Sequence, residues 1–258
     1  MPATIFTETR CRCVVCNRGV RATSLVPRPE HGRVFEAQRR IRLSDTDASG
    51  RLRLDAVARY LQDVATDDVV AAGAFSPDDL WLVRRSVVEV LVPFAADDTV
   101  ELATWCSGVG AAAAARRTSL AGDGGGRIET ETVWIHLDGE QRPARVSERF
   151  LAIYGEACGG RRASTRLELP DPPRHAERRP WPLRVTDVDV MGHVNNAAYW
   201  HAVEEALAPE TRPRPLAAVV EFRAAIDPDD DVQLVIAGEG IWLEAGGTVR
   251  AAAAVTVR

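Results

Sequence analysis

The sequence predicts an α+β fold in which one structural unit occurs twice, each unit being a central helix wrapped by an antiparallel sheet. Three observations lead to this prediction. Two blocks of sequence repeat in the same order, one amphipathic helix follows a short strand in each repeat, and several alternating strands follow each helix. At 258 residues, the chain is long enough to bury a full core without disulfide bonds.

The internal repeat is collinear over two pairs of segments. Asp47 and Gly50 match Asp189 and Gly192, which lie 142 positions later, whereas the second pair of segments is separated by 132 positions. A loop of about ten residues has therefore been lost from the second copy, and the chain is predicted to be a tandem duplication. The matched segments are Arg42–Leu52 with Arg184–Val194, and Val87–Leu102 with Val219–Leu234.

Each repeat contains the same kinds of element in the same order. Alternating segments at Phe35–Ser44 and Trp181–Thr186 predict half-buried strands before the helices. Apolar residues at helical spacing then predict the helices themselves: Val57, Tyr60, Leu61, Val64 and Ala65 in the first copy; Tyr199, Val203, Ala206 and Leu207 in the second. The further predicted strands are Leu80–Val92, Asp98–Gly108, Arg127–Leu137, Leu216–Ile226, Asp231–Gly240 and Thr248–Arg258.

This order of elements is that of the hot-dog unit, and two such units in one chain take the place of the usual dimer. We expect residues 1–34 to form a disordered N-terminal extension and residues 35–154 to form the first hot-dog unit. Residues 155–180 are rich in Gly, Pro and Arg, which predicts a linker across the outside of the protein. Residues 181–258 form the predicted second unit.

Composition restricts the classes of function. The net charge of −5 argues against a nucleic-acid-binding protein, although all 32 basic residues are arginine. No apolar run is long enough to span a membrane, so we expect no membrane insertion. The cysteines offer no defensible disulfide pairing, which predicts a cytoplasmic protein. Cys11, Cys13 and Cys16 could bind zinc only with a fourth ligand such as His31; we expect neither a metal nor an organic cofactor.

The segment "VTDVDVMGHVNNAAYW" places many polar side chains at a strand-to-helix junction. The first amides of a helix lack internal partners and can stabilise an oxyanion. Asp189 is the candidate general base or nucleophile, and His193 could polarise a carbonyl or orient water. Alternatively, Asp189 and the two asparagines could simply cap the helix. The candidate residues for the oxyanion and substrate are Gly192, Val194, Asn195 and Asn196.

The first copy serves as an internal control for this junction. Arg51 stands at the position of His193, and Arg53-Leu54 replaces Asn195-Asn196, while the aspartate and glycine of the turn remain. We therefore expect one active site per chain, in the second unit, with the first unit shaping an acyl pocket.

These motifs resemble those of the acyl-ACP thioesterase family of plants and bacteria, which are double hot-dog enzymes. "DVDVMGHVNNAAY" is similar to the family's second-domain motif, and "LWLVRRSVVEV" and "VELATWCSGVG" are similar to its first domain. The resemblance implies catalytic roles for Asp189 and His193. The sequence departs from the family at three positions: Met191 replaces a catalytic asparagine, and Ala225 and Ile226 replace an acidic residue and a cysteine.

The resemblance implies hydrolysis of a fatty acyl thioester, with acyl carrier protein as the partner. Arginine pairs such as Arg84-Arg85, Arg116-Arg117 and Arg161-Arg162 could meet that acidic protein. An acyl-CoA thioesterase, and a catalytically reduced protein that binds acyl chains or carrier protein, remain alternatives; a hot-dog dehydratase is disfavoured because its motif differs. The tandem chain already pairs two hot-dog units, so the sequence leaves open whether two such chains also form a homodimer.

Overall fold

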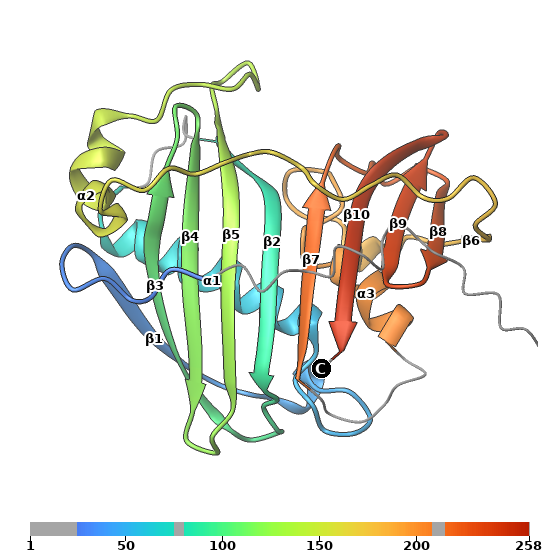
Figure 1. Ribbon diagram of the computed structural model, residues 1–258, viewed down its shortest axis with the longest axis horizontal. Helices are drawn as coiled ribbons and strands as arrows, with labels where there is room; N and C mark the ends of the chain where they lie inside the picture. Colours follow the sequence, from blue (N-terminus) through green and yellow to red (C-terminus); the bar gives the residue numbers. More distant parts are fainter. Residues whose placement is uncertain (1–24, 75–79, 208–214, 258) are drawn as a thin grey trace, which may run out of the picture.

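The computed structural model describes residues 25–74, 80–207 and 215–257, and within them the strands form one continuous sheet (Figure 1). Ten strands follow the order β1-β3-β4-β5-β2-β7-β10-β9-β8-β6, and each neighbouring pair is antiparallel. The strands are β1 Val34–Arg40, β2 Leu80–Val92, β3 Thr99–Val109, β4 Ala113–Gly122, β5 Arg127–Leu137, β6 Arg178–Pro180, β7 Leu216–Phe222, β8 Val232–Ala237, β9 Gly240–Ala245 and β10 Thr248–Val257.

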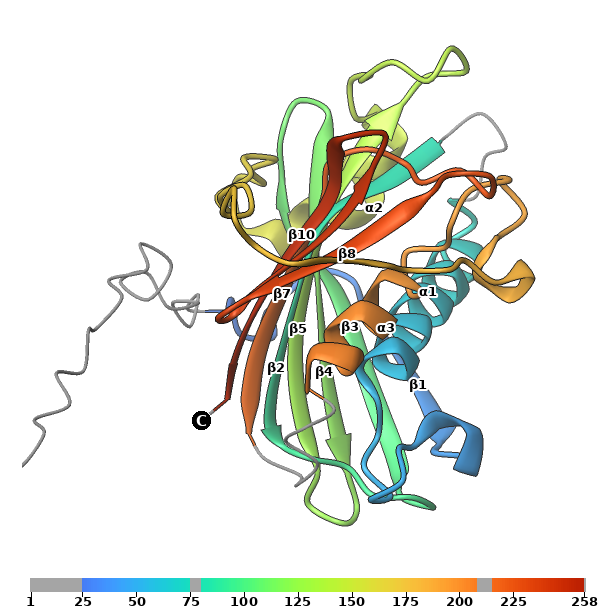
Figure 2. The ribbon, with the colours of Figure 1, turned by 90° about the vertical axis from the view of Figure 1, so that its right-hand side faces the viewer.

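Two helices, α1 (Leu54–Ala71) and α3 (Tyr199–Leu207), lie next to one another on one face of this sheet (Figure 2). Their apolar stripes pack on the sheet in a single buried core that runs through both halves of the chain. Each helix belongs to one half of the sheet, so the predicted double hot-dog fold is confirmed.

The two halves of the sheet join where β2 pairs with β7. Val87 lies opposite Val219 at this junction, and these are the residues that the internal repeat matches to one another. Equivalent strands of the two copies therefore pair across an approximate two-fold axis, as the same strands would in a dimer of single units.

Three local predictions differ from the structure. The predicted strand at Trp181–Thr186 is absent: Pro182 lacks an N–H for a sheet hydrogen bond, and the 3₁₀ turn η3 (Val185–Asp187) follows. A three-residue strand, β6, pairs with β8 just before this segment. Strands β4 and β9 lacked a clear alternating pattern and were missed. Helix α2 (Glu148–Cys158) spans the position at which we divided the first unit from the linker.

The linker crosses the face of the sheet that is opposite α1 and α3 (Figure 1). Leu169 packs there on apolar side chains from β2, β7 and β10. Glu221 of β7 is 1 % exposed, and its carboxylate accepts hydrogen bonds from the amides of Glu168 at 2.7 Å and Leu169 at 3.1 Å. Glu221 thus has the structural role of fixing the linker to the sheet.

The cysteines divide into two groups. Cys11, Cys13 and Cys16 lie outside the described residues, as does most of the predicted N-terminal extension. Cys106 of β3 and Cys158 of α2 are buried free thiols, with Sγ atoms 3.3 Å apart. This thiol pair is part of the contact that holds α2 on β3.

Candidate active site

The predicted junction in the second copy is a tight turn followed by α3. The Asp189 amide donates to the carbonyl of His193 at 3.0 Å, and the Gly192 amide donates back to the Asp189 carbonyl at 2.9 Å. Gly192 has φ +78°, a left-handed conformation in which a side chain would be strained. The Asn195 amide then bonds to the Asp187 carbonyl at 2.7 Å, which fixes the start of the helical segment.

The first copy repeats this turn bond for bond, 142 positions earlier. The Asp47 amide donates to the carbonyl of Arg51 at 2.8 Å, and the Gly50 amide donates to the Asp47 carbonyl at 2.9 Å. Gly50 has φ +83°, and Arg53 bonds to the Asp45 carbonyl as Asn195 does to Asp187. The aspartate–glycine framework therefore builds the turn in both copies, whether or not a copy carries the histidine and asparagines.

A cavity of about 440 Å³ opens beside the turn of the second copy. Asp189, Val190, Asn195 and Asn196 line one part of it, and residues of the first unit form the rest. Its wall is largely apolar and aromatic, which suits a hydrocarbon chain. Among the residues that form this wall are Val69 of α1, Trp81 of β2, Ala114 of β4 and Phe150 of α2.

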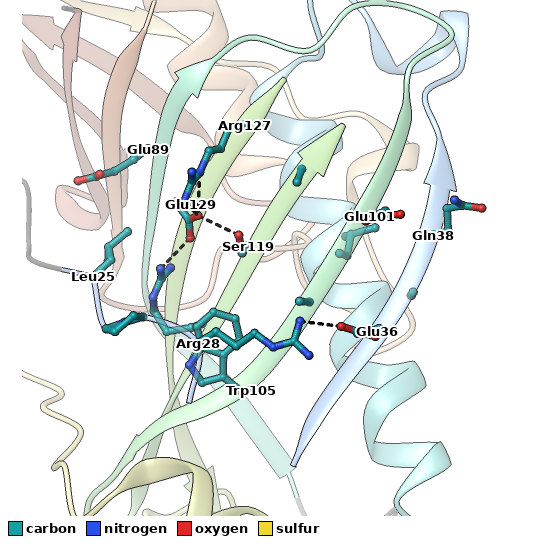
Figure 3. A pocket seen from close by; sticks show the side chains of 16 residues that line it. Leu25, Arg28, Glu36, Gln38, Glu89, Glu101, Trp105, Ser119, Arg127 and Glu129 are labelled. Atoms are coloured by element: carbon teal, nitrogen blue, oxygen red, sulfur yellow. Dashed lines mark hydrogen bonds and ion pairs between the residues drawn. The ribbon is translucent and has the colours of Figure 1, made fainter. Parts of the chain in front are cut away.

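A larger hollow of about 900 Å³ lies on the opposite face of the first half-sheet (Figure 3). Several of its charged side chains pair with one another: Arg28 with Glu36 at 2.6 Å, and Glu129 with Arg117 at 2.8 Å. Ser119 also donates to Glu129, at 2.8 Å. None of the candidate catalytic residues lines this hollow, so the smaller cavity is the candidate active site.

The side chains of Asp189 and Asn195, which both line the cavity, are hydrogen-bonded to each other. Asp189 Oδ1 accepts a hydrogen bond from the Met191 amide at 2.9 Å, and its Oδ2 accepts one from Asn195 Nδ2 at 3.3 Å. Asn195 Oδ1 in turn accepts from the Ala197 amide at 2.8 Å. Asn195 therefore has the capping role that we gave as the alternative, and it also orients the Asp189 carboxylate.

His193 lies on the outer side of the turn. Its Nδ1 is 2.8 Å from Oδ1 of Asp227, both side chains are about half exposed, and neither lines the cavity. Asp189 thus lines the cavity and His193 does not, and the structure gives His193 a carboxylate partner that our reading of the sequence missed. Asp227 is 34 residues from His193 in the chain, and the motif contains no signal for this contact.

The backbone amides at the turn are unequal as donors to a substrate. Those of Gly192 and Val194 are occupied, because they donate to the carbonyls of Asp189 and Ile226. Within the described residues, the amide of Asn196 donates to no protein acceptor. Of the four residues predicted to bind an oxyanion or substrate, Asn196 is therefore the one whose amide remains available.

In the first copy, the amide that matches Asn196 is that of Leu54, and it is occupied. It donates at 2.6 Å to the carboxylate of Glu204, a residue of α3 in the other unit. Arg51, at the position of His193, binds the same carboxylate at 2.5 Å. The residue of α1 that matches Glu204 is Gln62, which lines the same cavity as Asn196. In the first copy, a carboxylate of the protein itself therefore binds the amide that has no partner in the second copy.

The three departures from the family pattern lie outside the cavity lining. Met191 and Ala225 are exposed, whereas Ile226 is fully buried and its carbonyl accepts the Val194 amide at 3.0 Å. Ile226 therefore packs in the core and anchors the turn through its backbone.

Two further properties bear on function. No helix in the described part of the chain combines the length and apolar character needed to cross a bilayer. Over the same residues, no three side chains of His, Cys, Asp or Glu gather into a group that could hold a metal ion.

Comparison with known families identifies the class of protein. The model of the acyl-ACP thioesterase N-terminal domain matches residues 32–154, and that of the C-terminal domain matches residues 171–250. The chain belongs to the acyl-ACP thioesterase family. Members of this family are thioester hydrolases, so thioester hydrolysis is the general activity of the chain.

Several proteins are similar in sequence or in fold to this member of the acyl-ACP thioesterase family. An uncharacterized protein of Mycobacterium tuberculosis is 35% identical over 205 residues, covering 79% of this chain and 82% of its own. The 12:0-ACP thioesterase from Umbellularia californica has the same fold, with a TM-score of 0.73 at 19% identity over 88% of this chain and 98% of its own. An acyl-ACP thioesterase from Bacteroides thetaiotaomicron gives 0.69 at 14% identity, covering 87% of this chain and 98% of its own.

Proposed function

We propose that this protein hydrolyses fatty acyl thioesters of acyl carrier protein, with the acyl chain in the 440 Å³ cavity. The observation that carries the proposal is that Asp189 and Asn196 line one end of a largely apolar cavity. A carboxylate and an available helix-start amide therefore meet where a thioester could lie.

In this mechanism Asp189 acts as general base. It removes a proton from water, the resulting hydroxide attacks the carbonyl carbon, and the C–S bond breaks as the tetrahedral intermediate collapses. The Asn196 amide donates to the oxyanion, a contribution that is typically about a hundred- to a thousand-fold in rate. The bond from Leu54 to the Glu204 carboxylate supports this role, because the matching amide donates there to an anionic oxygen.

His193 is proposed to act from the solvent side of the thioester. The leaving thiolate must take up a proton, which an imidazolium at the mouth of the site can donate and then regain from solvent, while Asp189 returns its own proton to solvent. Asp227 would orient the ring through its 2.8 Å contact with Nδ1. This scheme needs neither the asparagine nor the acid–cysteine pair that Met191, Ala225 and Ile226 replace.

The choice of carrier protein over coenzyme A depends on family membership. The arginine pairs considered as docking groups are largely used within the protein: Arg116 binds Asp68 at 2.7 Å, and Arg161 donates to the Ser107 carbonyl at 3.0 Å. Arg117 is likewise buried and paired. Arg161 and Arg162 are nevertheless exposed, and within the described residues Arg162 makes no hydrogen bond or ion pair, so this pair still offers positive charge to an acidic partner.

The test is release of free thiol from acyl-ACP and acyl-CoA substrates of varied chain length, by the native protein and by Asp189→Asn. We expect faster release from acyl-ACP, and a loss of about a hundred- to ten-thousand-fold in the variant. Faster release from acyl-CoA would assign the sister activity. Binding without release from any substrate would identify an acyl-binding protein instead.

A further inference from the structure

Two buried thiols from distant parts of the chain lie in contact with each other. Cys106 of β3 and Cys158 of α2 are 52 positions apart in the sequence, and their Sγ atoms are 3.3 Å apart. The sulfurs of a disulfide bond are about 2.0 Å apart. The two atoms therefore need to approach by little more than about 1 Å for a bond to form.

A single arginine joins β3 and α2 directly beside the thiols. Arg161 donates to the carbonyl of Ser107 at 3.0 Å and to the carbonyl of Ala157 at 2.8 Å. These carbonyl groups belong to the chain neighbours of Cys106 and Cys158. The arginine thus fixes the backbone at both cysteines and keeps their sulfur atoms facing one another.

The surroundings favour a thiolate at Cys158. The hydrogen bond with Cys106 lowers the pKa of the Cys158 thiol, and the positive charge of Arg161 lowers it further, against the effect of burial. The same hydrogen bond raises the pKa of Cys106, which keeps its proton. Thiolates are the form of cysteine that reacts with oxidants. One sulfur of the pair is therefore prepared for oxidation, with a thiol in contact to resolve the product.

The thiol pair belongs to the wall of the proposed acyl cavity. Cys106 lines this cavity together with Ala114, and α2 contributes Phe150 and Tyr154 to the same wall. Cys106, Ala114, Tyr154 and Cys158 also form one buried cluster, on which Phe150 packs. A small oxidant can thus reach the pair through the cavity, and an acyl chain in the cavity would block its path.

We propose that Cys106 and Cys158 form a reversible disulfide, and that this bond fixes α2 as a rigid wall of the acyl pocket. Disulfides that form and break in this way are typical of redox sensing. The oxidant is a hydroperoxide, of which hydrogen peroxide is the simplest.

The reaction has two steps. The Cys158 thiolate attacks one oxygen of hydrogen peroxide, the O–O bond breaks, and the departing hydroxide takes up a proton to become water, which leaves a sulfenic acid at Cys158. The Cys106 sulfur then attacks the Cys158 sulfur, so that the S–S bond forms and the S–O bond breaks. The hydroxyl group leaves as water with the proton of Cys106. The two thiols lose two electrons in total, and one peroxide is reduced to two waters.

The bond restricts the part of α2 that faces the cavity. Tyr154 lies about one helical turn before Cys158, and Phe150 about two turns before it. A chain that fills the cavity needs this wall to yield, whereas a shorter chain does not. Building on the proposed thioesterase function, we expect the oxidised protein to discriminate against the longest acyl chains that the reduced protein accepts.

The test of the bond is treatment of the reduced protein with hydrogen peroxide, followed by tryptic digestion and mass spectrometry without reducing agent. Cleavage after arginine places the two thiols in separate peptides, Ser86–Arg116 and Phe150–Arg161. We expect these peptides to be joined, with the loss of two hydrogen atoms, and to separate in dithiothreitol. Two free thiols, or sulfinic acid at either cysteine without a cross-link, overturn the inference.

Variants show which cysteines are needed. A protein with Cys11, Cys13 and Cys16 replaced by serine should form the same cross-link, and Cys158→Ala should form none. Oxidation should also raise the unfolding temperature of the native protein, because the bond closes a long loop of the chain. Cys158→Ala should not show this rise, and an equal rise in that variant overturns the inference.

Binding and turnover test the link with the pocket. Saturating dodecanoic acid should slow cross-linking in proportion to the fraction of protein that is occupied. Oxidation should lower kcat/KM about fivefold or more for the longest accepted acyl thioesters, as expected when a tightly packed wall cannot relax, and leave shorter ones unchanged. The ratio of long-chain to short-chain kcat/KM should not respond to peroxide in Cys158→Ala.

The outcomes separate the disulfide from the thioesterase proposal. Cross-linking without turnover of any thioester overturns the thioesterase proposal and leaves the disulfide standing. If calorimetry shows that the acid binds, an unchanged rate of cross-linking overturns the link between the thiols and the pocket. Equal kcat/KM ratios before and after oxidation overturn the same link.

Discussion

The carboxylate of Glu204 accepts a hydrogen bond from the backbone amide of Leu54 at 2.6 Å, so a side chain of one hot-dog unit caps the helix of the other. The bond lies at the position in the first copy that corresponds to the proposed oxyanion site in the second. The residue that matches Glu204 is the neutral Gln62, and this difference in charge suggests a direct test of the site.

Gln62→Glu should inhibit the enzyme. The new carboxylate would face the Asn196 amide as Glu204 faces Leu54, and would compete with the substrate oxygen for it. We expect kcat/KM for an acyl thioester to fall at least about tenfold. Gln62→Leu, which removes the amide without adding charge, is the control; equal losses in the two variants would contradict the oxyanion role of Asn196.

Glu204→Ala should destabilise the fold. Its carboxylate is mostly buried and serves both Leu54 and Arg51, so the loss is expected to be about 2–3 kcal/mol in the free energy of unfolding. Glu205→Ala on the same helix removes only an exposed pair with Arg179 and should cost less than about 1 kcal/mol. Urea denaturation of both variants measures the difference, and similar losses would refute the capping role.

Asp227→Asn and His193→Ala should lower kcat/KM by similar factors, about tenfold each, because Asp227 acts through the His193 ring. The double variant should then be no slower than His193→Ala alone. Asp229→Asn, an exposed carboxylate in the same loop, is the control. Independent, additive losses would mean that the two residues do not work as a pair.

Asp55 should make stability depend on acid pH. Burial alone would raise the pKa of this carboxyl, but hydrogen bonds from His201, Arg53 and Arg59 outweigh it and hold the pKa well below its usual range. The ionised Asp55 therefore stabilises the fold at pH values above its unfolded pKa of about 4, and this contribution declines as the pH falls further.

Asp55→Asn tests this dependence. The variant should lose about 3 kcal/mol of unfolding free energy at neutral pH, and its difference from the native protein should shrink below about pH 4. Asp63→Asn, at an exposed position on the same helix, should change the unfolding free energy little at either pH. A constant difference between Asp55→Asn and the native protein across this range would rule out the linkage.

The periodic signals in the sequence predicted the double fold, both central helices and the Asp–Gly turn, because these depend on local pattern and on the repeat. The functional surroundings of the turn depend on contacts between distant segments. Asp227 reaches His193 across 34 residues, and Glu204 reaches Leu54 across 150. Tyr154 belongs to α2, a helix that our division of the chain cut in two. The occupied amides of Gly192 and Val194 likewise became apparent only from their partners in the folded chain.

The pairing of Val87 with Val219 has a consequence for how such a protein can change over evolutionary time. In a dimer of identical units, every substitution appears twice, so a glutamate at the position of Glu204 would stand against both helix starts and close both sites. Joining the units in one polypeptide removes this constraint. The turn of the first unit can then serve stability, because Glu204 of the second unit occupies its free amide. The turn of the second unit faces the neutral Gln62 instead, and its amide stays available to a substrate.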